Sequence, residues 1–233
     1  MTVSGVGPAW LWLPALLVGA GAGGLVARWL RSAGYRLQDE RDRPVRAVGW
    51  VVPVTGLLWA TLAWRLGAGE LRAYLPVALF LATVGVALTA VDLDVHRLPE
   101  RLTLPSYPVV ILLLVVASAV TGLWRPLLVA LVAGAVSVVV YFLLFVLAAL
   151  TSPGGLGFGD VVLSGIIGLA LGWLGAGLAL FALLAAFLVA GVAALGLVLT
   201  RRATRQTRIA FGPFMLVGAW LTVILAPGVA VLF

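Results

Sequence analysis

Carboxylates at the edges of apolar runs are the residues of this sequence best suited to chemistry. Asp92 ends one long apolar run, and Asp160 follows Gly157-Phe158-Gly159 and opens another. Two carboxylates within hydrogen-bonding reach share a proton, because like charges that close cannot both ionise cheaply. The ionised carboxylate can activate a water while the protonated one donates to a carbonyl oxygen, which hydrolyses a peptide without a metal or a covalent intermediate. We therefore predict that Asp92 and Asp160 meet in space as an acid–base pair.

The other ionisable residues near Asp92 have a more ordinary explanation. Asp94 and Glu100 stand beside arginines between two apolar runs, and we expect them, together with His96, to be solvated loop residues. His96 is the only imidazole, and the chain contains no cysteine. Disulfides, thiolate metal sites and cysteine nucleophiles are therefore excluded, a zinc site or a Ser-His triad is poorly supported, and we predict no metal.

Each candidate aspartate could also have a purely structural role. The glycines before Asp160 suit any turn between helices, since glycine tolerates positive φ, and Asp160 could then be the N-cap of the next helix. Asp92 could be a solvated carboxylate at the membrane interface. Against both explanations, these are the only two acids that abut apolar helices on one predicted face, and each lies beside a locally broken backbone.

The composition is that of a membrane protein. Of the 233 residues, 64% are hydrophobic and only 10% are charged, with a mean hydropathy of +1.21, whereas a soluble domain is usually about half apolar. The apolar blocks have the length of a membrane-spanning helix, roughly 20 residues, and lack the alternation of a barrel strand. We predict an all-α polytopic membrane bundle of about eight transmembrane helices. They lie at 8–30, 46–65, 72–92, 104–123, 126–150, 160–173, 175–199 and 210–232.

The formal charge of +7 comes from fifteen arginines without any lysine, and their distribution predicts the topology. Twelve of the fifteen lie at Arg28 or in the loops 31–46, 93–103 and 200–209. Cytoplasmic loops carry such an excess, so we expect both termini outside the cytoplasm and both aspartates at the cytoplasmic face. We interpret the arginines as topology signals and expect no binding to nucleic acid.

No repeat or low-complexity segment divides the chain, and we treat 1–233 as a single membrane domain. Within it, 1–66 is expected to form an N-terminal helical pair with a short cytoplasmic loop, and 72–233 the core that carries both aspartates. Five glycines blur the helix boundary within 160–200, and small residues at such spacing are typical of close helix packing. They are Gly165, Gly168, Gly172, Gly175 and Gly177.

Three sequence blocks together resemble the type IV prepilin leader peptidases, membrane aspartyl proteases that carry a GxGD motif. The stretch 91–103, VDLDVHRLPERLT, is similar to the family's first aspartate block, in which the catalytic acid precedes the proline by seven residues. The second block is 157–160, GFGD, and 210–214, AFGPF, resembles the family's PFGP segment. The resemblance covers about 72–225 and implies Asp92 and Asp160 as catalytic residues. The residues implied to bind substrate or shape the site are Gly157, Phe158, Gly159, Pro99, Glu100, Phe211, Gly212 and Pro213.

The resemblance implies an endopeptidase of the cell membrane whose substrates are pilin-like precursors, prepilins or pseudopilins. Cleavage in such enzymes falls after a glycine that ends a short basic leader, on the cytoplasmic face. Recognition is expected to rest on helix packing and on the acids near 92–100. Apart from the precursor and the surrounding lipid no partner is implied, cleavage needs no cofactor, and the oligomeric state is left open.

The chain departs from the family pattern in three places. Val162 occupies the position of the usual lysine two residues after the GxGD aspartate. The loop after the first helix shrinks to about 31–46 and lacks the zinc-binding cysteines that many members carry. No GSFLN-like segment, which is tied to N-methylation of the new amino terminus, is recognisable in 21–35. Peptidase activity is therefore expected, whereas methyltransferase activity, which would require S-adenosylmethionine, stays open.

Two other functions compete with proteolysis. A cation or proton transporter would bind its ion at Asp92 and Asp160, but it needs polar residues through the whole membrane, and these helices are almost bare of them. A catalytically inactive scaffold for pilus or secretion assembly is the second alternative, and Val162 keeps it open. Replacement of either aspartate by asparagine separates the three functions, because only a peptidase would lose cleavage of a precursor.

Overall fold

The computed structural model describes residues 7–40, 46–151, 156–200 and 210–226. Over these residues the chain folds into eight α-helices joined by short connections, some of which contain a 3-10 turn. The helices are α1 (Trp12–Arg31), α2 (Val51–Leu66), α3 (Leu75–Val95), α4 (Glu100–Thr121), α5 (Arg125–Thr151), α6 (Phe158–Gly172), α7 (Ala176–Leu199) and α8 (Gly212–Leu225).

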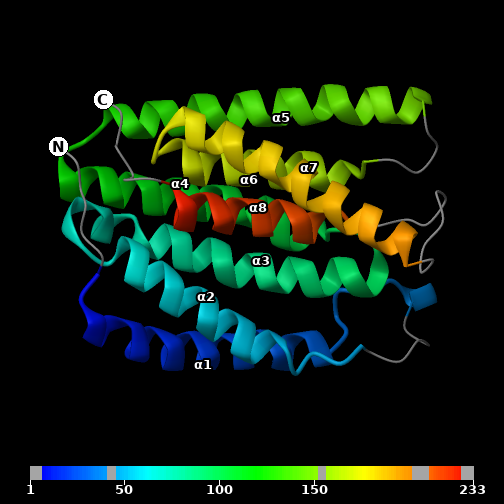
Figure 1. The fold of residues 1–233 in the computed structure, drawn as a ribbon, viewed down its shortest axis with the longest axis horizontal. Coiled ribbons are helices and arrows are strands. Elements are labelled where there is room, and N and C mark those ends of the chain that lie inside the picture. Colours follow the sequence, from blue (N-terminus) through cyan, green and yellow to red (C-terminus); the bar gives the residue numbers. More distant parts are fainter. Residues whose placement is uncertain (1–6, 41–45, 152–155, 201–209, 227–233) are drawn as a thin grey trace.

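The helices form a membrane bundle in which successive helices run in opposite directions (Figure 1). Among the described residues, α1, α3, α4, α5 and α7 are long and apolar enough to cross a membrane, while α2, α6 and α8 are shorter apolar helices. α1 and α5 lie at opposite edges of the bundle. The predicted all-α polytopic membrane fold is therefore confirmed. Because directions alternate, the end of α3 and the start of α6, which carry the two aspartates, lie at the same end of the bundle.

α6 is the most buried helix of the bundle. Twelve of its fifteen residues are buried, and it contacts α4, α5, α7 and α8. Its two ends are tied by tyrosines from other elements: the Tyr74 hydroxyl donates to the Ala170 carbonyl at 2.9 Å, and the Tyr107 hydroxyl donates to the Val162 carbonyl at 2.7 Å. A side chain in the first turn of α6 is therefore held on a rigid support.

Several helix boundaries differ from those expected. α3 extends to Val95 and ends with His96 in the left-handed region at φ 52°, and α4 already begins at Glu100 with Pro99 as its N-cap. The predicted loop 93–103 is thus only a tight turn, because the fixed φ of proline suits a helix start. α6 begins at Phe158 rather than at 160. The predicted last helix reaches 232, but its final residues lie outside the described part of the chain.

Three of the five glycines named above pack against neighbouring helices, as predicted. A Cβ atom on Gly168 would lie 2.8 Å from the Ala133 carbonyl oxygen of α5, and one on Gly172 would lie 2.7 Å from the Ala133 Cβ. Gly165 faces α5 and also α4. Gly175 instead occupies a positive φ of 144° before α7, and Gly177 has open space around it. The first three therefore permit close contact between α5 and α6.

We expect Gly168→Val to destabilise the bundle by about 1–3 kcal/mol, the usual cost of overpacking. The added Cβ would meet backbone of α5, which cannot move away as a flexible side chain can. Thermal unfolding in detergent should show a lower midpoint than the wild-type chain. Gly191→Val is the matched control, since no heavy atom lies within 4 Å of the added Cβ in the exposed face of α7. Equal midpoints for the two variants would contradict this account.

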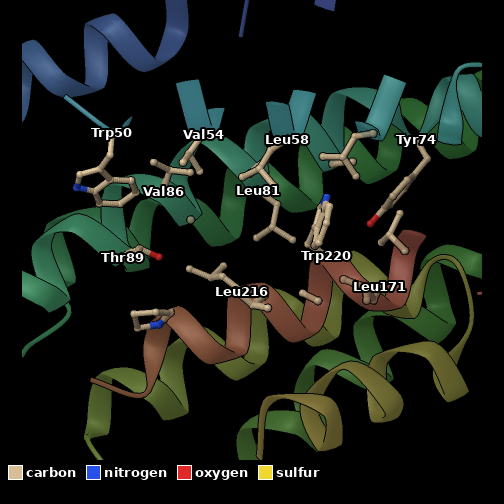
Figure 2. A pocket seen from close by; sticks show the side chains of 18 residues that line it. Trp50, Val54, Leu58, Tyr74, Leu81, Val86, Thr89, Leu171, Leu216 and Trp220 are labelled. Carbon is tan, nitrogen blue, oxygen red and sulfur yellow. The ribbon is translucent and has the colours of Figure 1, made fainter. Parts of the chain in front are cut away.

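An apolar pocket of ≈ 270 Å³ lies between α2, α3 and α8 (Figure 2). Leu81 and Val86 point into it from α3, and Leu216 and Trp220 from α8. Its lining contains no carboxylate, histidine, lysine or arginine. Such a pocket can hold apolar groups within the membrane, but it offers no acid or base, so the candidate chemistry lies elsewhere.

Candidate active site

Asp92 lies in the last turn of α3 and is only 5% exposed. Its Oδ2 atom is buried and has no well-aligned hydrogen-bond partner among the described residues. The backbone of Gly212, the first residue of α8, lies against this atom: a Cβ on Gly212 would be 3.0 Å from it. Asp92 also lines a cavity, described below, so its carboxylate is within reach of a molecule bound there.

Asp160 is the third residue of α6 and is 7% exposed. Its Oδ2 atom accepts a hydrogen bond of 3.0 Å from the backbone N–H of Gly157, which is the N-cap of the helix. Asp160 is therefore not itself the N-cap, and its side chain folds back over the glycine turn. This bond satisfies one free amide at the helix start and fixes the carboxylate in one orientation.

Glycine allows the two aspartate segments to approach each other. A Cβ on Gly159 would lie 2.7 Å from the Cβ of Leu98, in the turn that follows Asp92. The start of α6 is thus pressed against the α3–α4 turn. With Gly212 against Asp92, the three sequence blocks 91–103, 157–160 and 210–214 converge at one end of the bundle, and each contact depends on the absence of a side chain.

One cavity of ≈ 550 Å³ contains both aspartates. Phe158, half-exposed, and Phe145 of α5 also line the cavity, and their rings meet edge to face at a centroid distance of 6.0 Å. The cavity therefore offers a pair of acids next to apolar and aromatic walls, an arrangement suited to a peptide.

The predicted site-shaping residues divide into two groups. Five of them line the same cavity: Gly157, Phe158, Gly159, Glu100 and Phe211. Gly212 contacts Asp92 as described above, whereas Pro99 is the buried N-cap of α4 and Pro213 lines the apolar pocket. Val162, which replaces the lysine of the family pattern, also lines the cavity, as do His96 and Arg97. Among the described residues, no cluster of three histidines or acids could hold a metal ion.

Asp94 is not the solvated loop residue that we expected. Its side chain is 5% exposed and is paired with Arg36, whose side chain is 2% exposed. Arg36 Nε and Nη2 donate to the two carboxylate oxygens at 2.9 Å each, and the Tyr35 hydroxyl donates to Oδ2 at 2.7 Å. Burial, together with the neighbouring Asp94 carboxylate, raises the pKa of the Tyr35 hydroxyl to about 12, so Tyr35 remains a neutral donor.

A second ion pair lies beside the first. Arg97 donates to both carboxylate oxygens of Glu40, at 3.1 and 2.7 Å, and to the backbone carbonyl of Tyr35 at 2.9 Å. The hydrogen bonds from Arg97 to the Glu40 carboxylate lower the pKa of Glu40 to about 2. The pair is therefore complete above the ordinary pKa of a glutamate and weakens only as the pH falls towards 2. Sequence inspection missed both pairs, because partners some 58 residues apart carry no local signal.

Comparison with known proteins gives one family. Residues 79–199 match the model of the type IV leader peptidase family. A prepilin leader peptidase/N-methyltransferase of Aeromonas hydrophila is 32% identical in an alignment of 185 positions that covers 73% of this chain and 56% of the relative. A protein of the same name from Aeromonas salmonicida strain A449 is 31% identical, in an alignment that covers 73% of this chain and 55% of that relative. The chain thus spans about half the length of these curated relatives, and no solved structure matches it. Since the family model covers more than half of its residues, the chain belongs to the type IV leader peptidase family.

Proposed function

We propose that the chain is a membrane-embedded aspartyl endopeptidase that removes the short basic leader from pilin-like precursors. The observation that carries this proposal is the convergence of two buried aspartates, from α3 and α6, on one cavity. Family membership supports the same reaction, because the curated relatives are named prepilin leader peptidases. Asp92 and Asp160 are the proposed catalytic residues.

The proposed reaction is hydrolysis by general acid and base. Two neighbouring carboxylates hold one proton between them, because ionising both at short range is unfavourable. The ionised carboxylate removes a proton from a water, whose oxygen attacks the carbonyl carbon of the scissile bond, while the other carboxylic acid donates its proton to the carbonyl oxygen. Collapse of the tetrahedral intermediate breaks the C–N bond as the leaving nitrogen takes a proton from the first carboxyl group. The second carboxylate takes a proton back from one hydroxyl of the intermediate as the new carboxyl group forms, which restores the starting protonation state.

The charges around the cavity suit a basic leader. Asp92, Asp160 and the exposed Glu100 line it, and the positive charge of Arg97 is offset by Glu40. These acids can pair at close range with basic residues of a leader, whereas the arginine-rich loops assigned to the same face carry a net positive charge. We further propose that this end of the bundle faces the cytoplasm and that both termini lie outside it, in agreement with the arginine distribution.

The proposal is limited to cleavage. The chain covers 56% of the length of the A. hydrophila relative, whose name includes N-methyltransferase. The sequence shows no GSFLN-like segment, and we do not extend the methyl transfer of that relative to this chain. A single assay reports on both activities, because a methyl group on the new amino terminus changes the mass of the product.

The direct test is cleavage by the purified chain in nanodiscs. The substrate is a precursor with a basic leader that ends in glycine, followed by an apolar helix, and the products are identified by mass spectrometry with and without S-adenosylmethionine. We expect a leader peptide and a mature protein without any added cofactor. An intact precursor, with the chain monodisperse, would contradict the peptidase and favour an assembly scaffold. Cation flux into liposomes without cleavage would favour the transporter.

A further inference from the structure

We propose that Arg36 is a positioning residue for the peptidase site: it holds the turn that carries Asp92, from a segment outside the family's matched region. The inference rests on the proposed function, since it assigns Arg36 a role in that reaction. Arg36 lies five residues after the end of α1, whereas the family model matches only 79–199. The N-terminal segment would then be part of the catalytic apparatus and not merely an added helical pair.

The contact that carries the proposal is the buried pair of Arg36 with Asp94. Both nitrogens on one edge of the guanidinium bind both carboxylate oxygens at 2.9 Å, which is the planar two-point geometry that lysine cannot reproduce. Tyr35 adds a third hydrogen bond of 2.7 Å to the same carboxylate. Because both charged side chains are at most 5% exposed, loss of one partner leaves the other charge buried and unpaired.

The position of Asp94 explains how this contact reaches the site. Asp94 is two residues after Asp92 in the last turn of α3, just before His96 leaves the helix in the left-handed region. His96 takes this conformation as the residue that ends the helix, a position where a left-handed residue is common. The pair between Arg36 and Asp94 therefore anchors the end of α3 at the point where the backbone departs from the helix, next to Asp92.

A second connection joins the same two segments. Arg97, on the other side of His96, binds the Glu40 carboxylate and the Tyr35 carbonyl. Residues 35–40 thus hold the α3–α4 turn both before and after its left-handed residue. The same turn bears Leu98, against which Gly159 packs. A displacement of the turn would therefore also change its position relative to Asp160. We call this set of Tyr35, Arg36, Glu40, Asp94 and Arg97 the clamp.

Packing beneath the clamp joins the N-terminal helices to α3. Ala27 and Leu30 of α1 and Val51 of α2 form a buried cluster with Ala90 and Val91 of α3. Val91, fully buried, immediately precedes Asp92. The clamp therefore lies at the edge of an apolar cluster that packs α3 against α1 and α2. Its ion pairs hold the last turn of α3, which lies beyond this cluster.

Arg36→Met and Arg36→Lys test the proposal, with Arg31→Met as the control. Arg31 is an exposed arginine at the end of α1. For Arg36→Met we expect kcat for leader cleavage to fall about a hundredfold, as a misplacement of about 1 Å in a catalytic group would produce. KM should change little, because the acids that line the cavity are intact. Arg36→Lys should keep part of kcat, and Arg31→Met should match the wild-type chain.

Hydrogen exchange of the amides of residues 93–98 is measured on the same samples and needs no substrate. We expect faster exchange there in Arg36→Met and unchanged exchange in Arg31→Met. The double variant Arg36→Gln, Asp94→Asn keeps neutral hydrogen-bonding partners and leaves no unpaired charge, so it should stay folded even if Arg36→Met does not. Its kcat should also be reduced, because a neutral amide pair is weaker than the bidentate ion pair.

The outcomes separate the two proposals. If the wild-type chain cleaves the precursor but the folded Arg36 variants keep its kcat, Arg36 does not position the site. Unchanged exchange over 93–98 in Arg36→Met overturns the clamp irrespective of any enzymatic activity. If the wild-type chain leaves the precursor intact, the proposed function fails. A rise in KM with constant kcat would assign Arg36 to substrate binding instead of positioning and would equally overturn the inference.

Discussion

An Asp160→Asn variant is expected to cleave a pilin-like precursor about 10²–10⁴-fold more slowly than the wild-type chain, the range contributed by a positioned acid or base. The asparagine carbonyl can still accept the hydrogen bond that Asp160 Oδ2 accepts from Gly157, so the start of α6 should stay intact. The amide cannot take up or release a proton. Asp92→Asn should have a similar effect, because the reaction needs both members of the pair.

The double variant Asp92→Asn, Asp160→Asn provides a stringent test of the shared mechanism. If the two carboxylates act as one unit, removing both should cost little more than removing either, since catalytic residues that act together are not additive. Glu70→Gln is the control: Glu70 is an exposed acid in the 3-10 turn that precedes α3, at the opposite end of the bundle from the two aspartates. Initial rates of precursor cleavage give the comparison. Full processing by either single variant would falsify the peptidase mechanism.

Much of the fold could be predicted because a bilayer leaves few choices. Apolar blocks of spanning length must be helices, since every backbone polar group has to be satisfied within the segment. The end of α3 was harder to place, because the charges of 92–101 suggested a loop while the backbone remains helical through Val95 and again from Glu100. Helix ends depend on capping and on tertiary contacts such as that of Arg36 with Asp94, which hydropathy does not report.

The candidate site could be proposed from the sequence to the extent that its signals are local. Asp92 and Asp160 can be recognised because each abuts an apolar helix, where an ionisable side chain costs free energy and is rare. Asp94, only two positions from Asp92, looked like a solvated residue because arginines follow it closely in the sequence. Its partner is instead Arg36, one of six arginines between 28 and 46, and no sequence pattern distinguishes this one from its neighbours. Pairing across such a distance is a property of the packed bundle.

Gly212→Val is expected to reduce kcat about a hundredfold without unfolding the chain. The added Cβ would lie 3.0 Å from Asp92 Oδ2, closer than ordinary contact, and the two further methyl groups of valine would crowd the same carboxylate. A shift of about 1 Å in a catalytic group costs roughly this factor. Gly212→Ala should lose much less, because the Asp92 side chain can yield by a few tenths of an ångström. Steady-state kinetics on the two variants would show this graded response.

The graded series distinguishes a steric effect on the Asp92 carboxylate from damage to α8. Gly212 is the first residue of α8 and does not have the positive φ that would require glycine, so a larger residue does not strain its backbone. Gly191→Val, in open space on α7, controls for the valine itself. Thermal midpoints of Gly212→Val and the wild-type chain should agree within the error of measurement. Wild-type kcat in Gly212→Val would mean that Asp92 tolerates displacement, which is incompatible with a catalytic acid held in place by α8.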